Sequence, residues 1–308
     1  MQDPAFTAPG RFWRGNLHTH SNRSDGALAP EEVCRRYREE GYDFIALTDH
    51  FIGEYDYPIV DTVPFRTDTF TTILGAEVHS GAMENGELWH ILAVGLPADF
   101  APSKSPHFKP VEGMETGPEL ARRCRDAGAF VAVAHPEWGG LTLDDARSID
   151  AAHAVEIYNH GCQVGADRAE GFWHLDRLLE EGRKLTLCAT DDAHFTEPDH
   201  FGGWTMVKAA ENTPEALLAA LKAGHMYAST GPLIHDVQWG DESVQVRCSP
   251  AANVIVQGRG SATSAIHGTG MGTVEVPYGR VGQSAWMRLT VIDGAGKRAW
   301  TNPVWNND

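Results

Sequence analysis

Two histidines and an aspartate stand close together near the start of this 308-residue chain, in the segment NLHTHSNRSDG. One residue separates His18 from His20, so on an extended segment both imidazoles point to the same side. Neutral imidazoles and carboxylates suit Zn²⁺, Mn²⁺ and Fe²⁺. The pair can therefore bind one ion, and a turn at 24–26 can bring Asp25 back toward it; the alternative role for Asp25 is a helix cap.

Residues of the same types stand at the ends of other short apolar runs. They are Asp49, His50, Glu77, His90, His135, Asp192 and His194. A single histidine in such a place is more often structural, but this many buried acids and imidazoles would be costly without ions or hydrogen-bond partners. The set therefore predicts a metal site.

The elements that must position these residues alternate between helical and strand patterns up to residue 231. Helical spacing occurs at 30–43, 117–129, 166–184 and 213–228, and buried strands follow. Such alternation predicts an α/β fold with a mainly parallel sheet. In an αβ barrel the carboxyl ends of the strands converge on one face, where the polar residues would meet.

The pattern changes after residue 231. Apolar and polar residues then alternate in short runs between glycine-rich turns, which predicts a small antiparallel β unit. We therefore expect two domains, 11–231 and 232–308. His235 and His267 lack the strand-end setting of the earlier histidines, so we expect no metal ligand from the second domain.

Five segments, taken in order, resemble the polymerase and histidinol phosphatase (PHP) superfamily. They are HTHSNRSDG, LTDH, GAE followed by HILAVG, AHP and TDDAHF. The resemblance covers about residues 14–231 and implies a distorted (β/α)7 TIM-like barrel with two to three divalent ions, Mn, Fe or Zn. It implies hydrolysis of small phosphate mono- or diesters by a metal-bridging hydroxide. The segment GHMYASTGP is similar to the branch that includes carbaryl hydrolase.

The resemblance also implies three ion sites, the first and third of which share Glu77. The first site would use His18, His20, Glu77 and Asp192. The second would use Asp25, His50 and His194. The third would be bridged by Glu77 and completed by His90 and His135, with His79 as a less favoured alternative to His90.

Other residues are candidates for catalysis or substrate binding. The chosen catalytic candidates are His160, Asp191 and Arg23. His160 could donate a proton to the leaving group, Asp191 could hold a metal-binding imidazole, and Arg23 could bind the substrate phosphate. Arg168 and His200 could also bind phosphate or donate the proton. Each has a structural or surface role as its alternative, and Asp49 is open in the same way as Asp191. Trp138 and Trp204 are expected in the core or at the rim, with stacking on a base or aryl group as the alternative.

Composition limits the classes of partner. A net charge of −17 argues against bulk nucleic acid, while ions could still attract a small phosphate ester. There is no apolar stretch for a membrane span, and five scattered cysteines fit a reducing compartment. The first residues lack signal-peptide features, so we expect a cytoplasmic location, with a removed signal peptide as the alternative. The oligomeric state is not predicted.

Two other functions stay open. One is hydrolysis of an aryl carbamate or carboxylic ester at the same metal centre. The other is a non-catalytic metal-binding or interaction module, which the full set of nine metal-competent residues disfavours.

Overall fold

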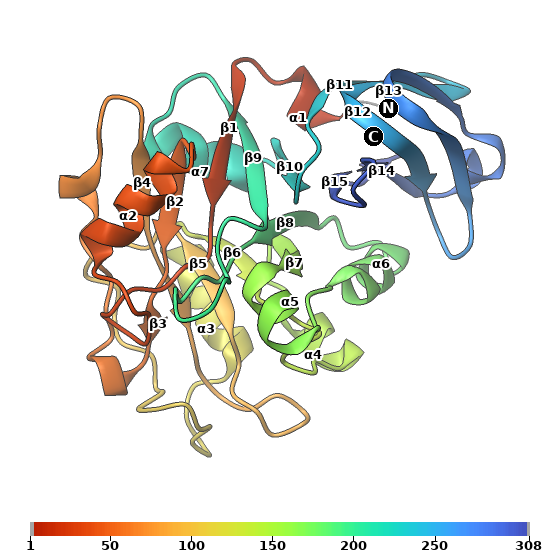
Figure 1. Ribbon diagram of the computed structural model, residues 1–308. Helices are drawn as coiled ribbons and strands as arrows, with labels where there is room; N and C mark the ends of the chain where they lie inside the picture. The colour runs from red at the N-terminus through yellow and green to blue at the C-terminus, as the bar shows by residue number, and fades with distance from the viewer. Residues whose placement is uncertain (1–2, 307–308) are drawn as a thin grey trace.

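One large mixed sheet organises the structure, a computed structural model that describes residues 3–306 (Figure 1). The strand order is β11-β12-β14-β15-β10-β9-β1-β2-β4-β5-β6-β7-β8, with β13 beside β12, β16 beside β14 and β3 beside β4. The first ten strands are β1 (Arg11–Asn16), β2 (Phe44–Leu47), β3 (His50–Phe51), β4 (Thr71–Val78), β5 (Ile91–Val94), β6 (Phe130–Val133), β7 (Ala154–Asn159), β8 (Thr186–Thr190), β9 (Trp204–Ala209) and β10 (Met226–Ser229). The others are β11 (Ile234–Trp239), β12 (Ser243–Gln257), β13 (Thr263–Pro277), β14 (Trp286–Ile292), β15 (Arg298–Thr301) and β16 (Val304–Trp305).

Helices accompany the first part of this sheet. The α-helices are α1 (Pro4–Thr7), α2 (Pro30–Glu39), α3 (Gly117–Asp126), α4 (Leu143–Ser148), α5 (His160–Ala166), α6 (Phe172–Glu180) and α7 (Pro214–Lys222). Short 3₁₀ helices are η1 (Gly53–Tyr55), η2 (Val63–Phe65) and η3 (Gly279–Gln283). None of the helices in 3–306 combines the length and apolar character needed to cross a bilayer. The five cysteines are all buried as free thiols.

Local sequence explains where the main helices begin. The α2 helix starts with Pro30, whose fixed φ suits the first helical position. The α3 helix starts with a capping box, in which Thr116 and Glu119 each accept a hydrogen bond from the other's backbone N–H. In α7 the side chain of Thr213 caps the helix and Pro214 follows. The α2 helix packs on β2, α3 packs on β5 and β6, and α7 packs on β4, β6 and β9.

Strand direction differs from the mainly parallel sheet expected from the sequence. The pairs β1–β2, β2–β4, β6–β7 and β7–β8 are parallel, whereas β4–β5, β5–β6 and β1–β9 are antiparallel. A parallel return needs a long crossover that usually contains a helix. Residues 79–90 between β4 and β5 contain no helix and include a β-bridge between Ala82 and Leu88. The chain therefore returns as a hairpin, and the sheet is mixed.

The expected TIM-like barrel is not closed by backbone ladders in the described chain. A strand has two edges, and β9 uses one for β1 and the other for β10. The edge of β8 next to β9 is joined instead through the hydroxyl of Thr205, which donates to Ala189 O at 2.9 Å and accepts from Ala189 N at 3.3 Å. The fold is an α/β structure with one open mixed sheet.

The C-terminal strands continue this sheet, because β15 pairs with β10. Two of the alternating runs after residue 231, SVQVRCS and NVIVQG, form the single strand β12, with register shifts between Arg247 and Asn253 around Pro250. Proline cannot donate to a ladder, so an irregularity at this point lets the strand continue. His235 is exposed on β11, and His267 bonds Asn253 on the neighbouring strand. Neither belongs to a group of metal-competent residues found in 3–306.

A buried arginine connects the C-terminal strands to α6. The guanidinium of Arg288 on β14 donates to both carboxylate oxygens of Asp176 at 3.2 and 3.0 Å and to Gln257 Oε1 at 2.9 Å. It also lies over the ring of Phe172, with 4.3 Å from Cζ to the centroid. The Arg288 side chain is 5% exposed, so its charge depends on these partners.

We predict that Asp176→Ala lowers the free energy of unfolding by about 2 kcal/mol, because it leaves a buried guanidinium without its carboxylate. This loss of stability is smaller than that expected for breaking a fully buried ion pair, because Asp176 is 32% exposed. The matched control is Asp150→Ala, which removes an exposed partner of Arg122 and should cost less than about 1 kcal/mol. Urea unfolding measures both; equal losses would contradict this role of Arg288.

Candidate metal centre

Glu77, the second-to-last residue of β4, lies at the centre of a cluster of imidazoles and carboxylates and is fully buried. Its Oε1 accepts hydrogen bonds from His90 Nδ1 at 2.7 Å and His135 Nε2 at 3.1 Å. Its Oε2 lies 2.7 Å from His50 Nδ1 but has no hydrogen-bond partner. Burial opposes the charge, yet the imidazoles of His50, His90 and His18 outweigh it and hold the pKa of Glu77 well below its usual range. The two carboxylate oxygens therefore face different imidazoles: Oε1 faces His90 and His135, and Oε2 faces His50.

Two loops meet to form the first group of potential ligands. The backbone N–H of His20 donates to Ala193 O at 2.8 Å, and that of Asp192 donates to His18 O at 2.8 Å. These bonds join the loop after β1 to the loop after β8. They place the His-x-His pair beside Asp192 and above Glu77.

The donor atoms of this group surround one point. Asp192 Oδ1 lies 3.2 Å from His18 Nε2 and 3.0 Å from His20 Nε2, and Glu77 Oε2 lies 3.5 Å from both nitrogens. Ligands about 2.1 Å from a tetrahedral ion are about 3.4 Å apart. His18 Nε2 and Glu77 Oε2 are buried without hydrogen-bond partners, which is costly unless another group satisfies them. The residues present therefore fit a divalent ion.

A second group adjoins the first. Asp25 Oδ2 lies 3.4 Å from His50 Nε2, and Asp25 Oδ1 lies 3.3 Å from His194 Nε2. His20 also belongs to this group, because its Nδ1 lies 3.8 Å from Asp25 Oδ1. The expected turn at 24–26 is present, since Gly26 N donates to Ser21 O at 2.9 Å. This turn brings Asp25 to the two imidazoles.

Asp49 holds that turn in place. Its carboxylate accepts from Ser21 N at 2.7 Å, from Ser21 Oγ at 2.8 Å and from Ser24 Oγ at 2.8 Å. The sequence left open whether Asp49 bonds an imidazole or the backbone. The structure places it against the loop that carries His20 and Asp25.

The third group lies on the other side of Glu77. His90 and His135 both contact Glu77 Oε1, as described above, and His79 lies 3.9 Å from Oε2. His79 Nε2 is 2.9 Å from His50 Nδ1, and its Nδ1 is 2.9 Å from Trp89 O. His79 thus bridges His50 to the backbone, while His90 lies closer to the shared carboxylate.

The backbone is left-handed at two of these residues. His135 has φ +24° and Asp192 has φ +56°, a region that residues other than glycine rarely adopt. Such conformations persist where the surrounding structure determines them, often at functional sites. Both residues lie two positions beyond the end of a strand, where His135 contacts Glu77 and Asp192 contacts His18 and His20.

Glu156 on β7 is part of the centre and was missed in the sequence. Its fully buried carboxylate lies 3.0 Å from His18 Nδ1 and accepts from His135 N at 2.6 Å and Asn159 Nδ2 at 3.0 Å. A carboxylate on the far nitrogen of an imidazole fixes the ring and its tautomer. The only signal was an acid inside the apolar run AHAVEIYN, which has no motif spacing.

The three catalytic candidates lie outside the cavity beside the cluster. Asp191 is fully buried and accepts from Tyr37 Oη at 2.8 Å and from the backbone N–H groups of 201–203. Burial raises its pKa to about 6. His160 begins α5, bonds the hydroxyl of Tyr158 at 3.1 Å and packs against 202. Arg23 is exposed and lines a separate hollow beside Pro30.

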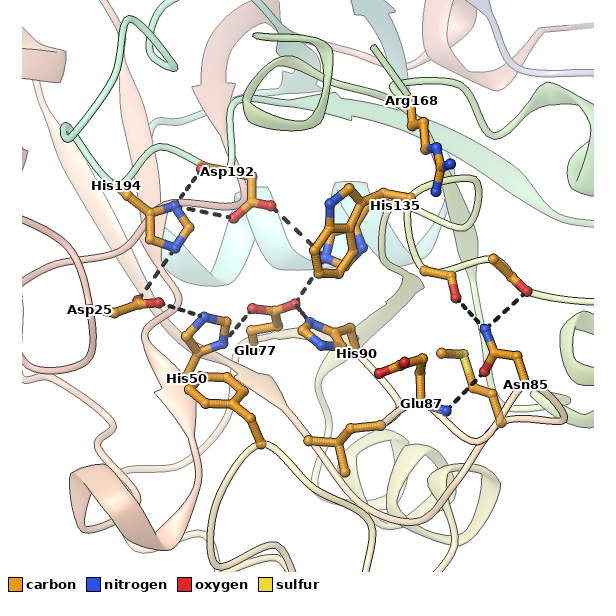
Figure 2. Close-up of a pocket in the computed structure, with 16 residues that line it drawn as sticks. Asp25, His50, Glu77, Asn85, Glu87, His90, His135, Arg168, Asp192 and His194 are labelled. Atoms are coloured by element: carbon orange, nitrogen blue, oxygen red, sulfur yellow. Dashed lines mark hydrogen bonds and ion pairs between the residues drawn. The ribbon is translucent and has the colours of Figure 1, made fainter. Parts of the chain in front are cut away.

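A cavity of about 720 Å³ opens onto the cluster (Figure 2). Seven potential ligands line it: Asp25, His50, Glu77, His90, His135, Asp192 and His194. Arg168 also lines it, while His200 and Trp204 do not. In Figure 2, Asn85, Glu87 and Arg168 stand across the cavity from Asp25 and His194. The cluster therefore forms one wall of a site large enough for a small molecule.

Protons occupy part of this cluster when metal is absent. Burial opposes protonation of His50, but Glu77 and Asp25 outweigh it and raise its pKa to about 10. Burial likewise opposes protonation of His194, but Asp25 and Asp192 raise its pKa to about 9. Both values exceed the unfolded value of about 6.5. The resulting stability is full below pH 6.5 and is lost as the pH rises toward 9–10.

We predict that Zn²⁺ or Mn²⁺ raises the Tm of the metal-free protein more at pH 8 than at pH 6. At pH 6 protons stabilise the cluster and compete with the ion; at pH 8 that stabilisation is declining and the ion replaces it. Differential scanning fluorimetry with and without chelator measures the increment. An equal or smaller increment at pH 8 would contradict the assignment, and His50→Gln with His194→Gln should remove much of the difference.

We predict that Glu156→Gln weakens the ion site at His18 by about 10- to 100-fold, because the amide orients the imidazole less well. Competition with a chromophoric chelator measures the affinity, and circular dichroism checks the fold. The control is Glu87→Gln, an exposed acid on the same cavity that bonds no potential ligand. Unchanged metal affinity in Glu156→Gln would show that Glu156 does not position His18.

The chain is similar to a curated protein, to a solved structure and to a protein family. The uncharacterized protein MJ1295 of Methanocaldococcus jannaschii is 25% identical over 209 residues, 67% of this chain and 84% of that protein. A crystal structure from Bacteroides vulgatus, of a two-domain protein containing a predicted PHP-like metal-dependent phosphoesterase, covers 99% of both chains with a TM-score of 0.54 and 16% identity. At that identity the likeness establishes the fold alone. The PHP domain family model matches residues 16–196, which hold all nine expected ligands. The resemblance inferred from the sequence motifs is thus confirmed, and the chain belongs to the PHP domain family.

Proposed function

We propose that this protein is a metal-dependent hydrolase of small phosphate esters, mono- or diesters, with two to three divalent ions in the cluster around Glu77. The observation that carries the proposal is the set of three adjoining groups of imidazoles and carboxylates beside one cavity, two of which contain Glu77. Membership of the PHP domain family, and the likeness to a predicted PHP-like phosphoesterase, support a hydrolase.

Nine residues would hold the ions. They are His18, His20, Glu77 and Asp192 for the first, Asp25, His50 and His194 for the second, and His90 and His135 with Glu77 for the third. When bound, the ions supply Lewis-acid stabilisation of phosphoryl oxygens and lower the pKa of water. Mn, Fe and Zn all accept this ligand set.

The charge balance supports attraction of a phosphate. Three divalent ions bring six positive charges, and Asp25, Glu77, Asp192 and Glu156 bring four negative charges, so the centre keeps about two positive charges. The chain as a whole carries −17. A single phosphoryl group would therefore be attracted to the cavity, whereas the flanking phosphates of a long strand would meet an acidic surface.

The reaction balances without a covalent enzyme intermediate. Water forms a new bond to phosphorus, the bond from phosphorus to the leaving oxygen breaks, and the proton lost by water is matched by one gained by the leaving oxygen. The main contribution of a protein to phosphoryl transfer is to position the phosphoryl group and to stabilise its charge, and the residues of the chain would do both here. The cavity of about 720 Å³ fits a small ester.

We predict that Asp192→Asn lowers turnover of an aryl phosphate by at least about 1000-fold without unfolding the chain, because it removes a ligand of the first ion. The matched control is His235→Ala, an exposed histidine of β11 far from the cluster in sequence, which should retain wild-type turnover. Colorimetric phosphate release after reconstitution with Mn²⁺, Fe²⁺ or Zn²⁺ measures both. Activity of Asp192→Asn within a few-fold of wild type would contradict the metal assignment.

The substrate class has its own test. We expect kcat/KM for a nucleotide or an aryl phosphodiester to exceed that for a single-stranded oligonucleotide under one metal condition. An oligonucleotide cleaved tenfold better would indicate a nuclease. Faster hydrolysis of an aryl carbamate than of an aryl phosphate at equal metal loading would indicate a carbon-centred hydrolase.

A further inference from the structure

We propose that the cavity carries an aromatic subsite for the leaving group, formed by Trp138 and Phe108. The inference rests on the proposed function and narrows it: the substrate is a small phosphate ester whose leaving alcohol carries an aromatic ring. Nothing in the metal cluster itself requires these two side chains.

Exposure singles them out. Of the phenylalanine and tryptophan side chains that the structure describes, the three most exposed are Trp173 at 56%, Trp138 at 44% and Phe108 at 38%. Trp138 and Phe108 both line the cavity beside the cluster. Leaving two large aromatic surfaces in water is unfavourable, and their concentration at one cavity indicates a ligand that covers them.

The two rings contact different parts of the centre. The Trp138 ring lies edge-on to His135 and His90, with centroids 4.9 and 5.5 Å apart. The Phe108 ring lies edge-on to His50 at 4.9 Å. A phosphoryl group bound between these imidazoles would therefore direct its substituent toward both aromatic side chains.

Part of the remaining cavity lining is apolar as well. Met83 and Leu88 line it and are each 4% exposed, and Met83 belongs to a hydrophobic core cluster. A methionine sulfur packs favourably against an aromatic ring and adapts to its shape. An apolar ring would therefore find further favourable contacts in this part of the lining.

The loop that carries Trp138 is held in place before any ligand binds. Its turn is closed by bonds from Gly139 N to His135 O at 3.1 Å and from Leu141 N to Pro136 O at 3.0 Å. Asn85, which also lines the cavity (Figure 2), donates from Nδ2 to Gly139 O at 2.8 Å. A preorganised ring loses little conformational freedom on binding, so its contact contributes to affinity.

The charged residues at the rim of the cavity do not favour a substrate of one particular charge. Glu87 and Arg168 are both exposed and stand on the side of the cavity away from Asp25 and His194 (Figure 2). One is acidic and one basic, so this end has no net charge to favour a second anionic group. The apolar wall is the feature left to distinguish one phosphate ester from another.

The test compares 2-phenylethyl phosphate with propyl phosphate on the metal-loaded full chain. The two leaving alcohols have nearly equal acidity, so chemical reactivity does not distinguish them. We expect kcat/KM to favour the phenylethyl ester by about 10- to 100-fold. Trp138→Ala and Phe108→Ala should each lower this ratio at least threefold, and Trp138→Phe should keep most of it. Trp173→Ala changes a still more exposed tryptophan outside the cavity and should leave the ratio unchanged.

Failure of the subsite and failure of the proposed function give different results. Hydrolysis of both esters with a ratio near one overturns the subsite and leaves the function standing. If neither ester is hydrolysed, the function fails, and calorimetric binding of the matching 2-phenylethyl and propyl phosphonates still decides the subsite. Equal Kd values for the two phosphonates overturn it, whereas tighter binding of the aromatic phosphonate that is lost in Trp138→Ala supports it.

Discussion

A buried carboxylate surrounded by imidazoles is the constraint on which the rest of the structure depends. Glu77 is fully enclosed at the end of β4, where an uncompensated charge would cost several kcal/mol. Partial compensation comes from His50, His90 and His135, which contact its two oxygens. One oxygen still lacks a hydrogen-bond partner, as does the nearby Nε2 of His18. The fold thus concentrates ligand atoms at a place where cations or protons can satisfy them.

A second row of buried carboxylates holds the loops around that point. Asp49 fixes the turn that carries Asp25, Asp191 fixes the segment at 201–203, and Glu156 fixes His18 from behind. Each accepts several hydrogen bonds, so the loops keep one arrangement although they are not part of helices or strands. The candidate site is therefore preformed, which a polynuclear centre requires if its ions are to share one ligand.

The sequence predicted the gathering of the cluster better than the sheet that supports it. His-x-His and the pair Asp192 with His194 are short motifs whose spacing survives any rearrangement of the strands, so their meeting could be anticipated. Whether the sheet closes could not be anticipated, because closure depends on which edge of β9 pairs with which strand. Strand direction could not be anticipated either, because apolar patterns do not encode it. Glu156 escaped notice since a lone acid in a strand has no spacing to mark it. The sequence could not place Arg23, which lines a hollow separate from the cavity, because the direction of an exposed side chain on a loop is set by tertiary contacts.

Metal content, with anomalous diffraction to locate each ion, tests the central claim most directly. After chelation and reconstitution, elemental analysis of the wild-type chain should give two to three divalent ions per chain, all within bonding distance of the cluster around Glu77. Glu77→Gln should bind fewer ions, because the shared carboxylate serves more than one of them. One ion or none in the wild type at saturating metal, or ions bound away from Glu77, would contradict the account.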